Sequence, residues 1–124
     1  MATVLLVDDD ASLRQLSANV LNSMGYRVLC ASGMEEAERQ LYEFGGEIHL
    51  LITDVVMPGG GGEVLVEKFG KLRPSAGILF ISGYTDGRVP QKYLTGNHPA
   101  FLPKPFTPAQ LAEKVREMLD TIRG

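Results

Sequence analysis

Short apolar runs alternate with longer segments of mixed polarity along the whole chain. We expect each run to form a β-strand, and each is too apolar to leave one face of its strand in water. Strands buried on both faces are typical of parallel sheets that carry helices on either side. The runs are Val4–Val7, Tyr26–Ala31, His49–Thr53, Gly77–Ser82 and Ala100–Pro103.

The segments between these runs repeat apolar residues with the period of an α-helix. The first helix should end at Gly25, and either Asp10 or Ser12 could cap its start. The last should begin at Pro108 behind a Thr107 cap. The other helices are expected at 35–44, at 63–72 and, as a short helix, at about 90–96. The inward stripe of the first helix is expected to be Leu13, Leu16, Val20, Leu21 and Met24.

Five strands that alternate with five helices predict an open, doubly wound α/β fold, because right-handed helical crossovers connect parallel strands. With 124 residues and a mass of 13.5 kDa, the chain should form one domain. Ligand sites in such folds lie beyond the carboxyl ends of the strands, where the strand order reverses. The polar residues at those ends are therefore the first candidates for a functional site.

Composition narrows the classes of function. The net charge is −3, and lysine and arginine are scattered rather than gathered in a basic stripe, so direct nucleic-acid binding is not expected. No apolar run approaches the roughly 20 residues of a membrane span, so no membrane contact is expected. Cys30 is the only cysteine and lies in an apolar run, so we expect a buried structural thiol. A cytoplasmic location fits these features.

Acidic side chains end two of the predicted strands. Asp8, Asp9 and Asp10 follow the first strand, and Asp54 follows the third. Because the carboxyl ends of parallel strands meet at one edge of a sheet, these carboxylates should gather there. Grouped like charges cost stability unless a cation or a reaction uses them. The acid cluster is therefore the strongest indication of function.

Ser82 and Lys104 stand at the ends of two further strands and complete a set of groups suited to phosphoryl transfer. Clustered carboxylates suit Mg²⁺, a hard cation that takes oxygen ligands. Lys104 could pair with Asp54 or with a phosphoryl oxygen, and the Ser82 hydroxyl could donate to another. A metal, an ammonium group and a hydroxyl around one carboxylate are what an aspartyl phosphate requires, without a separate general base.

Four motifs, in order along the chain, resemble those of response-regulator receiver domains of two-component signalling. The resemblance covers essentially the whole chain, so residues 1–124 are expected to be a single receiver domain. It implies a flavodoxin-like (βα)5 fold with strand order 2-1-3-4-5. The motifs are the acid pair Val7-Asp8-Asp9, the phosphoacceptor motif from Thr53-Asp54 to Met57-Pro58, Ile81-Ser82-Gly83, and Leu102-Pro103-Lys104-Pro105-Phe106.

The resemblance implies a role for each acid. Asp54 would accept phosphate from a histidine kinase or a histidine phosphotransfer protein. Asp9 and Asp54 would bind Mg²⁺ directly, with the backbone carbonyl of Val56 as a third ligand. Asp8 would help indirectly, often through water. Mg²⁺ is the only cofactor that the family pattern calls for.

The resemblance also implies a switch. Ser82 and Lys104 would hold phosphoryl oxygens, and Phe101 would turn inward as the Ser82 hydroxyl moves towards the phosphate. The Lys104–Pro105 peptide bond is usually cis in this family. The readout surface in relatives is the fourth helix, fifth strand and fifth helix, here about 90–122. We expect a monomer, or a weak dimer on phosphorylation, that assists its own phosphorylation and dephosphorylation rather than an enzyme with a metabolic substrate.

Two residues depart from the commonest family pattern. Val56 is apolar where many relatives carry a polar side chain, and Tyr84 places an aromatic ring beside the phosphate entrance. We hypothesise that both residues set the lifetime of the phosphoryl group by controlling the approach of water. The sequence around Ser82 and Lys104 resembles receivers of hybrid sensor kinases more than receivers that feed DNA-binding modules. The partner could then be a kinase core in the same polypeptide.

Two other interpretations of the sequence fit it less well. A degenerate receiver would keep the fold as a phosphorylation-independent interaction scaffold, but the site positions of the family all hold competent residues here. A small flavin-binding electron carrier would share the fold type. It would need a hydroxyl- or glycine-rich phosphate loop after the first strand, where this chain has three repelling acids.

Overall fold

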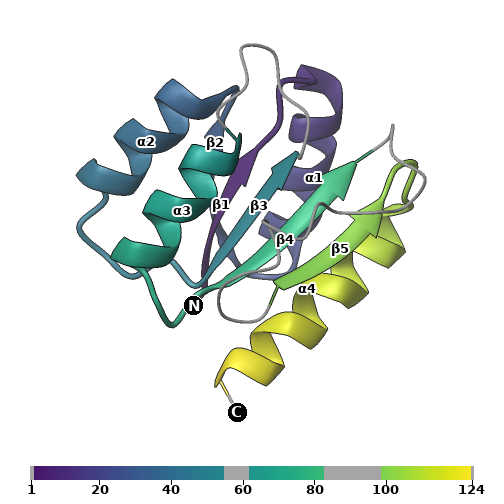
Figure 1. The fold of residues 1–124 in the computed structure, drawn as a ribbon. Helices are drawn as coiled ribbons and strands as arrows, with labels where there is room; N and C mark the ends of the chain where they lie inside the picture. Colours follow the sequence, from purple (N-terminus) through teal and green to yellow (C-terminus); the bar gives the residue numbers. More distant parts are fainter. Residues whose placement is uncertain (1, 55–61, 83–98, 124) are drawn as a thin grey trace.

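A computed structural model of the chain describes residues 2–54, 62–82 and 99–123 (Figure 1). Every expected strand is present, with each end at most one residue from its expected position. The short helix expected at about 90–96 lies outside the described residues. The strands are β1 (Thr3–Val7), β2 (Arg27–Ala31), β3 (Leu50–Asp54), β4 (Gly77–Ser82) and β5 (Pro99–Pro103). The helices are α1 (Ala11–Ser23), α2 (Met34–Glu43), α3 (Gly62–Leu72) and α4 (Pro108–Arg123).

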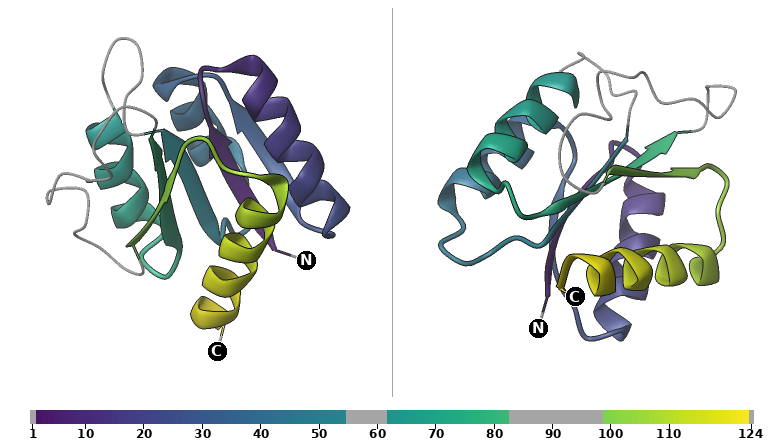
Figure 2. Two further views of the ribbon diagram at one scale, coloured as in Figure 1. Left: turned by 90° about the vertical axis from the view of Figure 1, so that its right-hand side faces the viewer. Right: turned by 60° about the horizontal axis from the view of Figure 1, so that its bottom comes forward.

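The strands form one parallel sheet in the order β2-β1-β3-β4-β5, which confirms the expected fold class and strand order. Helices cover both faces of this sheet. Figure 2 shows α2 and α3 on one face and α1 and α4 on the other. The strand order reverses between β1 and β3, so the carboxyl ends of these two strands flank the predicted ligand position.

Alternate residues of each strand enter two separate cores. In β3, Leu51 packs in the core under α2 and α3, while Leu50 and Ile52 pack in the core under α1 and α4. All three side chains are fully buried, and burial of one such side chain contributes about 1.5 to 3 kcal/mol to folding. The double burial explains why the strands read as continuous apolar runs.

Helix α1 begins and ends as the sequence predicts, but its buried face differs. Asp10 caps its start, because the Asp10 carboxylate accepts the N–H of Leu13 at 3.1 Å. Its end is set by Gly25, whose φ of +90° L side chains rarely adopt. The prediction that Leu16 points inward is wrong, since Leu16 is 47% exposed. The core side of α1 is Ser17, Ala18 and Leu21, because small residues also fill a close helix–sheet interface.

Helix α4 follows its prediction more closely. The Thr107 hydroxyl accepts the N–H of Gln110 at 3.1 Å, and the Gln110 side chain accepts the N–H of Thr107 at 2.8 Å. The buried residues of its expected stripe are Leu111, Val115, Met118 and Leu119. Cys30 is half-buried rather than fully buried and packs at the edge of the core under α1 and α4.

Candidate functional site

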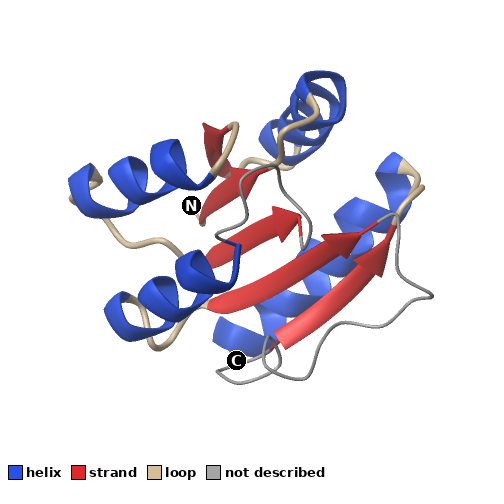
Figure 3. Ribbon diagram, turned by 45° about the horizontal axis from the view of Figure 1, so that its top comes forward, coloured by secondary structure: helices blue, strands red, loops and turns tan. Residues whose placement is uncertain are grey.

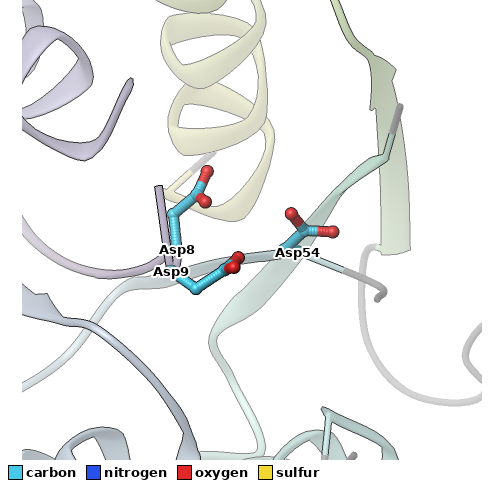
Figure 4. Close-up of side chains that lie close together, drawn as sticks. All are labelled: Asp8, Asp9 and Asp54. Carbon is cyan, nitrogen blue, oxygen red and sulfur yellow. The ribbon is translucent and has the colours of Figure 1, made fainter. Parts of the chain in front are cut away.

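The carboxyl ends of β1 and β3 bring the predicted acids together. Val7 lies beside Thr53 in the sheet register, so Asp8 and Asp54 come next on neighbouring strands. Figure 3 shows the arrowheads of the parallel strands at this common edge. Carboxylate oxygens of Asp8, Asp9 and Asp54 lie within 4.8 Å of one another (Figure 4). The predicted acid cluster is therefore present.

Lys104 reaches this cluster from the end of β5. Its Nζ donates to Oδ2 of Asp54 at 2.8 Å and lies 3.4 Å from Oδ2 of Asp8. The register of β4 and β5 carries Lys104 to the same edge, one residue beyond Pro103, which lies beside Ser82. A single ammonium group thus contacts carboxylates from two strands.

Burial governs the charges of this site. The side chain of Asp8 is 1% exposed, and this burial raises its pKa. The N–H of Asp10 and the charge of Lys104 oppose the rise, while the charge of Asp54 adds to it. Burial by itself lowers the pKa of Lys104, but the hydrogen bond to Asp54 and the charges of Asp8 and Asp54 outweigh it and raise that pKa overall. Lys104 is therefore a cation at neutral pH.

One oxygen of Asp8 is buried without a hydrogen bond from the described part of the chain, although it lies 3.4 Å from the Lys104 ammonium. Oδ1 of Asp8 accepts the N–H of Asp10 at 3.0 Å, but Oδ2 accepts no hydrogen bond from any described residue. A buried carboxylate oxygen without a hydrogen bond costs stability unless a ligand uses it. The donor set of clustered carboxylate oxygens suits a hard divalent cation such as Mg²⁺.

Arg14 contacts the site, although no motif in the sequence marks it as a site residue. Its Nη1 donates to the backbone carbonyl of Asp8 at 2.6 Å. The N–H of Asp8 donates to the carbonyl of Ala31 at 3.1 Å, so the main chain of Asp8 is held on both sides. A basic residue one helical turn behind the acid run was the only sequence signal for this contact.

The other predicted site residues are placed only in part. Ser82 ends β4, but its side chain is outside the description, as are Val56 and Tyr84. Phe101 lies beside Phe80 in the register and is half-buried against the core under α2 and α3. The Lys104–Pro105 peptide bond is cis, as the family resemblance implies.

Comparison with known proteins decides the family. The family model described as "Response regulator receiver domain" matches residues 4–116. The chain belongs to the response regulator receiver domain family. A receiver domain is a signalling domain of two-component systems, and it implies a histidine kinase or a phosphotransfer protein as partner. Receiver domains generally bind Mg²⁺ at an acidic cluster such as that of Asp8, Asp9 and Asp54.

The relatives of this receiver domain include part of a hybrid kinase. It is 39% identical over 119 residues to the sensor kinase CckA of Brucella abortus, covering 96% of this chain but 13% of that kinase. Among solved structures, it is similar to the receiver domain of the hybrid histidine kinase CckA, with 38% identity and a TM-score of 0.79 over 95% of this chain and 99% of that one. The predicted resemblance to hybrid-kinase receivers is confirmed.

A second solved structure matches the fold even more closely. The CheY-like receiver domain protein from Methanospirillum hungatei JF-1 has a TM-score of 0.88 at 28% identity, over 99% of this chain and 97% of that chain. Within the described part of this receiver domain, no helix has both the length and the apolar character needed to cross a membrane.

Proposed function

We propose that residues 1–124 act as a single receiver domain in a phosphorelay, with Asp54 as the phosphoacceptor. A histidine kinase or a histidine phosphotransfer protein is the donor, and Mg²⁺ is required. The observation that carries this proposal is the 2.8 Å contact between Lys104 Nζ and Asp54 Oδ2, inside a group of carboxylates in which one buried oxygen of Asp8 accepts no hydrogen bond from a described residue.

The chemistry follows from the charges around Asp54. An oxygen of the Asp54 carboxylate attacks phosphorus, the bond from phosphorus to the donor histidine breaks, and its electron pair returns to the imidazole. Lys104 keeps Asp54 oriented beforehand and holds a phosphoryl oxygen afterwards. Asp9, Asp54 and the carbonyl of Val56 would hold the metal, with Asp8 helping indirectly. Bound Mg²⁺ would supply neutralisation of the phosphoryl charge.

The output is a shift between two conformations. Phosphorylation adds a charge of about −2 beside Lys104, and the Ser82 hydroxyl moves to hold a phosphoryl oxygen. Phe101 is the second part of the switch, and it lies half-buried against the core under α2 and α3. The readout surface is assigned to about 90–122, of which the structure describes β5 and α4. The domain would act as a monomer or as a weak phosphorylation-dependent dimer.

The donor protein would approach along an open groove beside the site. The groove has a volume of about 540 Å³ and leads from Lys104 to the exposed side chain of Leu16. Its other walls include Leu13, Pro105 and Phe106. An apolar surface continuous with the phosphoacceptor site is suited to binding the domain that delivers the phosphoryl group.

The location would be cytoplasmic. Because the relative CckA is a kinase, a kinase core in the same polypeptide is one candidate donor.

Val56 and Tyr84 are proposed to set the phosphoryl lifetime by controlling the approach of water. The substitutions Val56→Asn and Tyr84→Ala should each change the rate of Asp54 dephosphorylation, followed by loss of the adduct after the phosphodonor is removed. Two unchanged rates would reject this role and leave the phosphoacceptor assignment intact.

Intact mass after incubation with acetyl phosphate tests the proposed function directly. The native chain should gain about 80 Da, the mass of one phosphoryl group, and only when Mg²⁺ is present. Asp54→Ala should gain nothing, while Asp120→Asn, an exposed acid on α4, should behave as the native chain. Absence of both an adduct and Mg²⁺ binding would favour the alternative, a degenerate receiver that works as a scaffold.

A further inference from the structure

Among the described residues outside the acid turn, only Arg14 makes a side-chain hydrogen bond to the main chain of that turn. The acid turn is Asp8-Asp9-Asp10, between β1 and α1. Side chains on a helix tilt towards its amino end, so Arg14 reaches back over the first turn of α1. Its Nη1 donates to the Asp8 carbonyl at 2.6 Å, and its own N–H donates to the Asp10 carbonyl at 2.9 Å. Arg14 therefore holds the turn by both its side chain and its backbone.

The carbonyl of Asp8 and the N–H of Asp9 belong to one rigid peptide plane. Fixing that carbonyl fixes where the Cα of Asp9 stands, and hence where its side chain begins. Asp8 is already restrained, since its N–H bonds to Ala31 and its Oδ1 accepts the Asp10 N–H. Asp9 is exposed, and its side chain makes no comparable hydrogen bond within the described part of the chain. The Arg14 contact thus fixes the peptide plane that leads into Asp9, the least restrained of the three acids.

A charged donor makes a shorter and stronger hydrogen bond than a neutral one. The Arg14 charge also acts on Cys30 of the neighbouring strand β2. Burial raises the pKa of the Cys30 thiol, and the charge of Arg14 opposes that rise. Without such a hold, repulsion among three carboxylates within 4.8 Å would favour turning Asp9 away from the others.

We propose that Arg14 is a positioning residue that sets the Asp8–Asp9 peptide plane and so presents the Asp9 carboxylate to a divalent cation. This inference rests on the proposed function, because it concerns the same magnesium site. Arg14 itself binds neither metal nor phosphate. Residues that orient metal ligands typically change metal affinity by 10- to 100-fold when they are replaced.

Calorimetric titration of the unphosphorylated chain with Mg²⁺ tests this role. Arg14→Met keeps much of the side-chain length but removes the charge and the donors. Positioning predicts that its Kd for Mg²⁺ rises about tenfold. A purely electrostatic role predicts the opposite sign, because removing a nearby positive charge should tighten Mg²⁺ binding. Arg14→Lys retains a charged donor and should recover part of the lost affinity.

The matched control is Arg39→Met, which makes the same substitution at an exposed arginine on α2. Its Mg²⁺ affinity should equal that of the native chain. At saturating Mg²⁺, Arg14→Met should accept phosphate from acetyl phosphate at nearly the native rate, whereas at limiting Mg²⁺ it should be about tenfold slower.

Unchanged or tighter Mg²⁺ binding by Arg14→Met would overturn this inference, whatever happens to its melting temperature. A lower melting temperature with unchanged Mg²⁺ affinity is the signature of a merely structural contact. If the native chain fails to bind Mg²⁺, the proposed function fails as well, so the two failures are distinguishable.

Discussion

At the scale of single residues, the buried and clustered carboxylates of the site lower the stability of the folded domain. Asp8 is buried beside Asp54, and its Oδ2 accepts no hydrogen bond within the described part of the chain. Lys104 offsets part of the repulsion through its contacts with both acids. The raised pKa of Asp8 indicates that burial and the charge of Asp54 outweigh the Asp10 and Lys104 contacts. The acid cluster is therefore expected to be a strained feature that a bound cation relieves.

Asp8→Asn should stabilise the metal-free domain. Its Oδ1 can still accept the Asp10 N–H, while the buried charge is removed. At neutral pH we expect the free energy of unfolding to increase by about 1 to 3 kcal/mol, the usual penalty for a buried polar group without a hydrogen bond. Urea unfolding in the presence of a chelator measures this difference, and Asp120→Asn is the exposed control.

The pH dependence of this effect has a definite sign. The pKa of Asp8 in the folded domain lies above its ordinary value of 3.8, so the folded state holds the proton more tightly than the unfolded state. The native domain therefore loses stability through Asp8 as the pH rises through the raised pKa. The advantage of Asp8→Asn should shrink as the pH falls towards 3.8. A variant that is less stable than the native domain at neutral pH would show that the Lys104 ion pair dominates instead.

At the scale of elements, the packing of α4 against β4 depends on a residue without a side chain. A Cβ on Gly77 would lie 2.6 Å from Cδ1 of Ile122 and 3.3 Å from Cδ1 of Leu50. Gly77 begins β4, and its N–H donates to the carbonyl of His49 at 3.1 Å. This close approach lets the end of α4 lie directly on the sheet. Gly70 on α3 differs, because nothing lies within 4 Å of its would-be Cβ.

Gly77→Ala and Gly70→Ala should therefore shift stability in opposite directions. Gly77→Ala should lower the free energy of unfolding by about 1 kcal/mol, since the Ile122 side chain must move. Gly70→Ala should raise it by about 0.5 to 1 kcal/mol, because alanine favours the helix. Ile122→Val, which lacks Cδ1, should reduce the cost of Gly77→Ala in the double variant. Chemical denaturation of the four variants checks this, and equal effects at the two glycines would contradict it.

At the scale of the whole molecule, the two edges of the sheet differ in role. Hydrogen bonds link the strands at the amino edge, and the candidate site lies at the carboxyl edge. At the amino edge, His49 joins three strands: its Nδ1 accepts the Thr3 N–H at 3.0 Å, its N–H donates to the Thr3 carbonyl, and its carbonyl accepts the Gly77 N–H. At the carboxyl edge, the acids and Lys104 gather where strand order reverses. Two buried cores hold the sheet between these edges.

The sequence by itself determined the strands, the fold class and the residues at the carboxyl edge. Strands buried on both faces leave an unmistakable pattern of short apolar runs, and a parallel sheet places every strand end at the same edge. Asp8, Asp9, Asp54 and Lys104 could be assigned to one site on that ground alone. The sequence also predicted the Thr107 cap and narrowed the cap of α1 to Asp10 or Ser12, because helix capping depends on residues that are close in sequence.

Only the tertiary structure decided how side chains meet. Apolar spacing marked Leu16 as inward, but the small residues Ser17 and Ala18 take the core side of α1, and Leu16 borders the groove instead. Residue spacing predicts neither the buried Asp8 oxygen that accepts no hydrogen bond from a described residue nor the Arg14 hydrogen bond to the acid turn. Such contacts depend on the direction of a turn's carbonyl group and on which strands are neighbours. Packing between residues far apart in the sequence sets both, so the local sequence pattern does not show them.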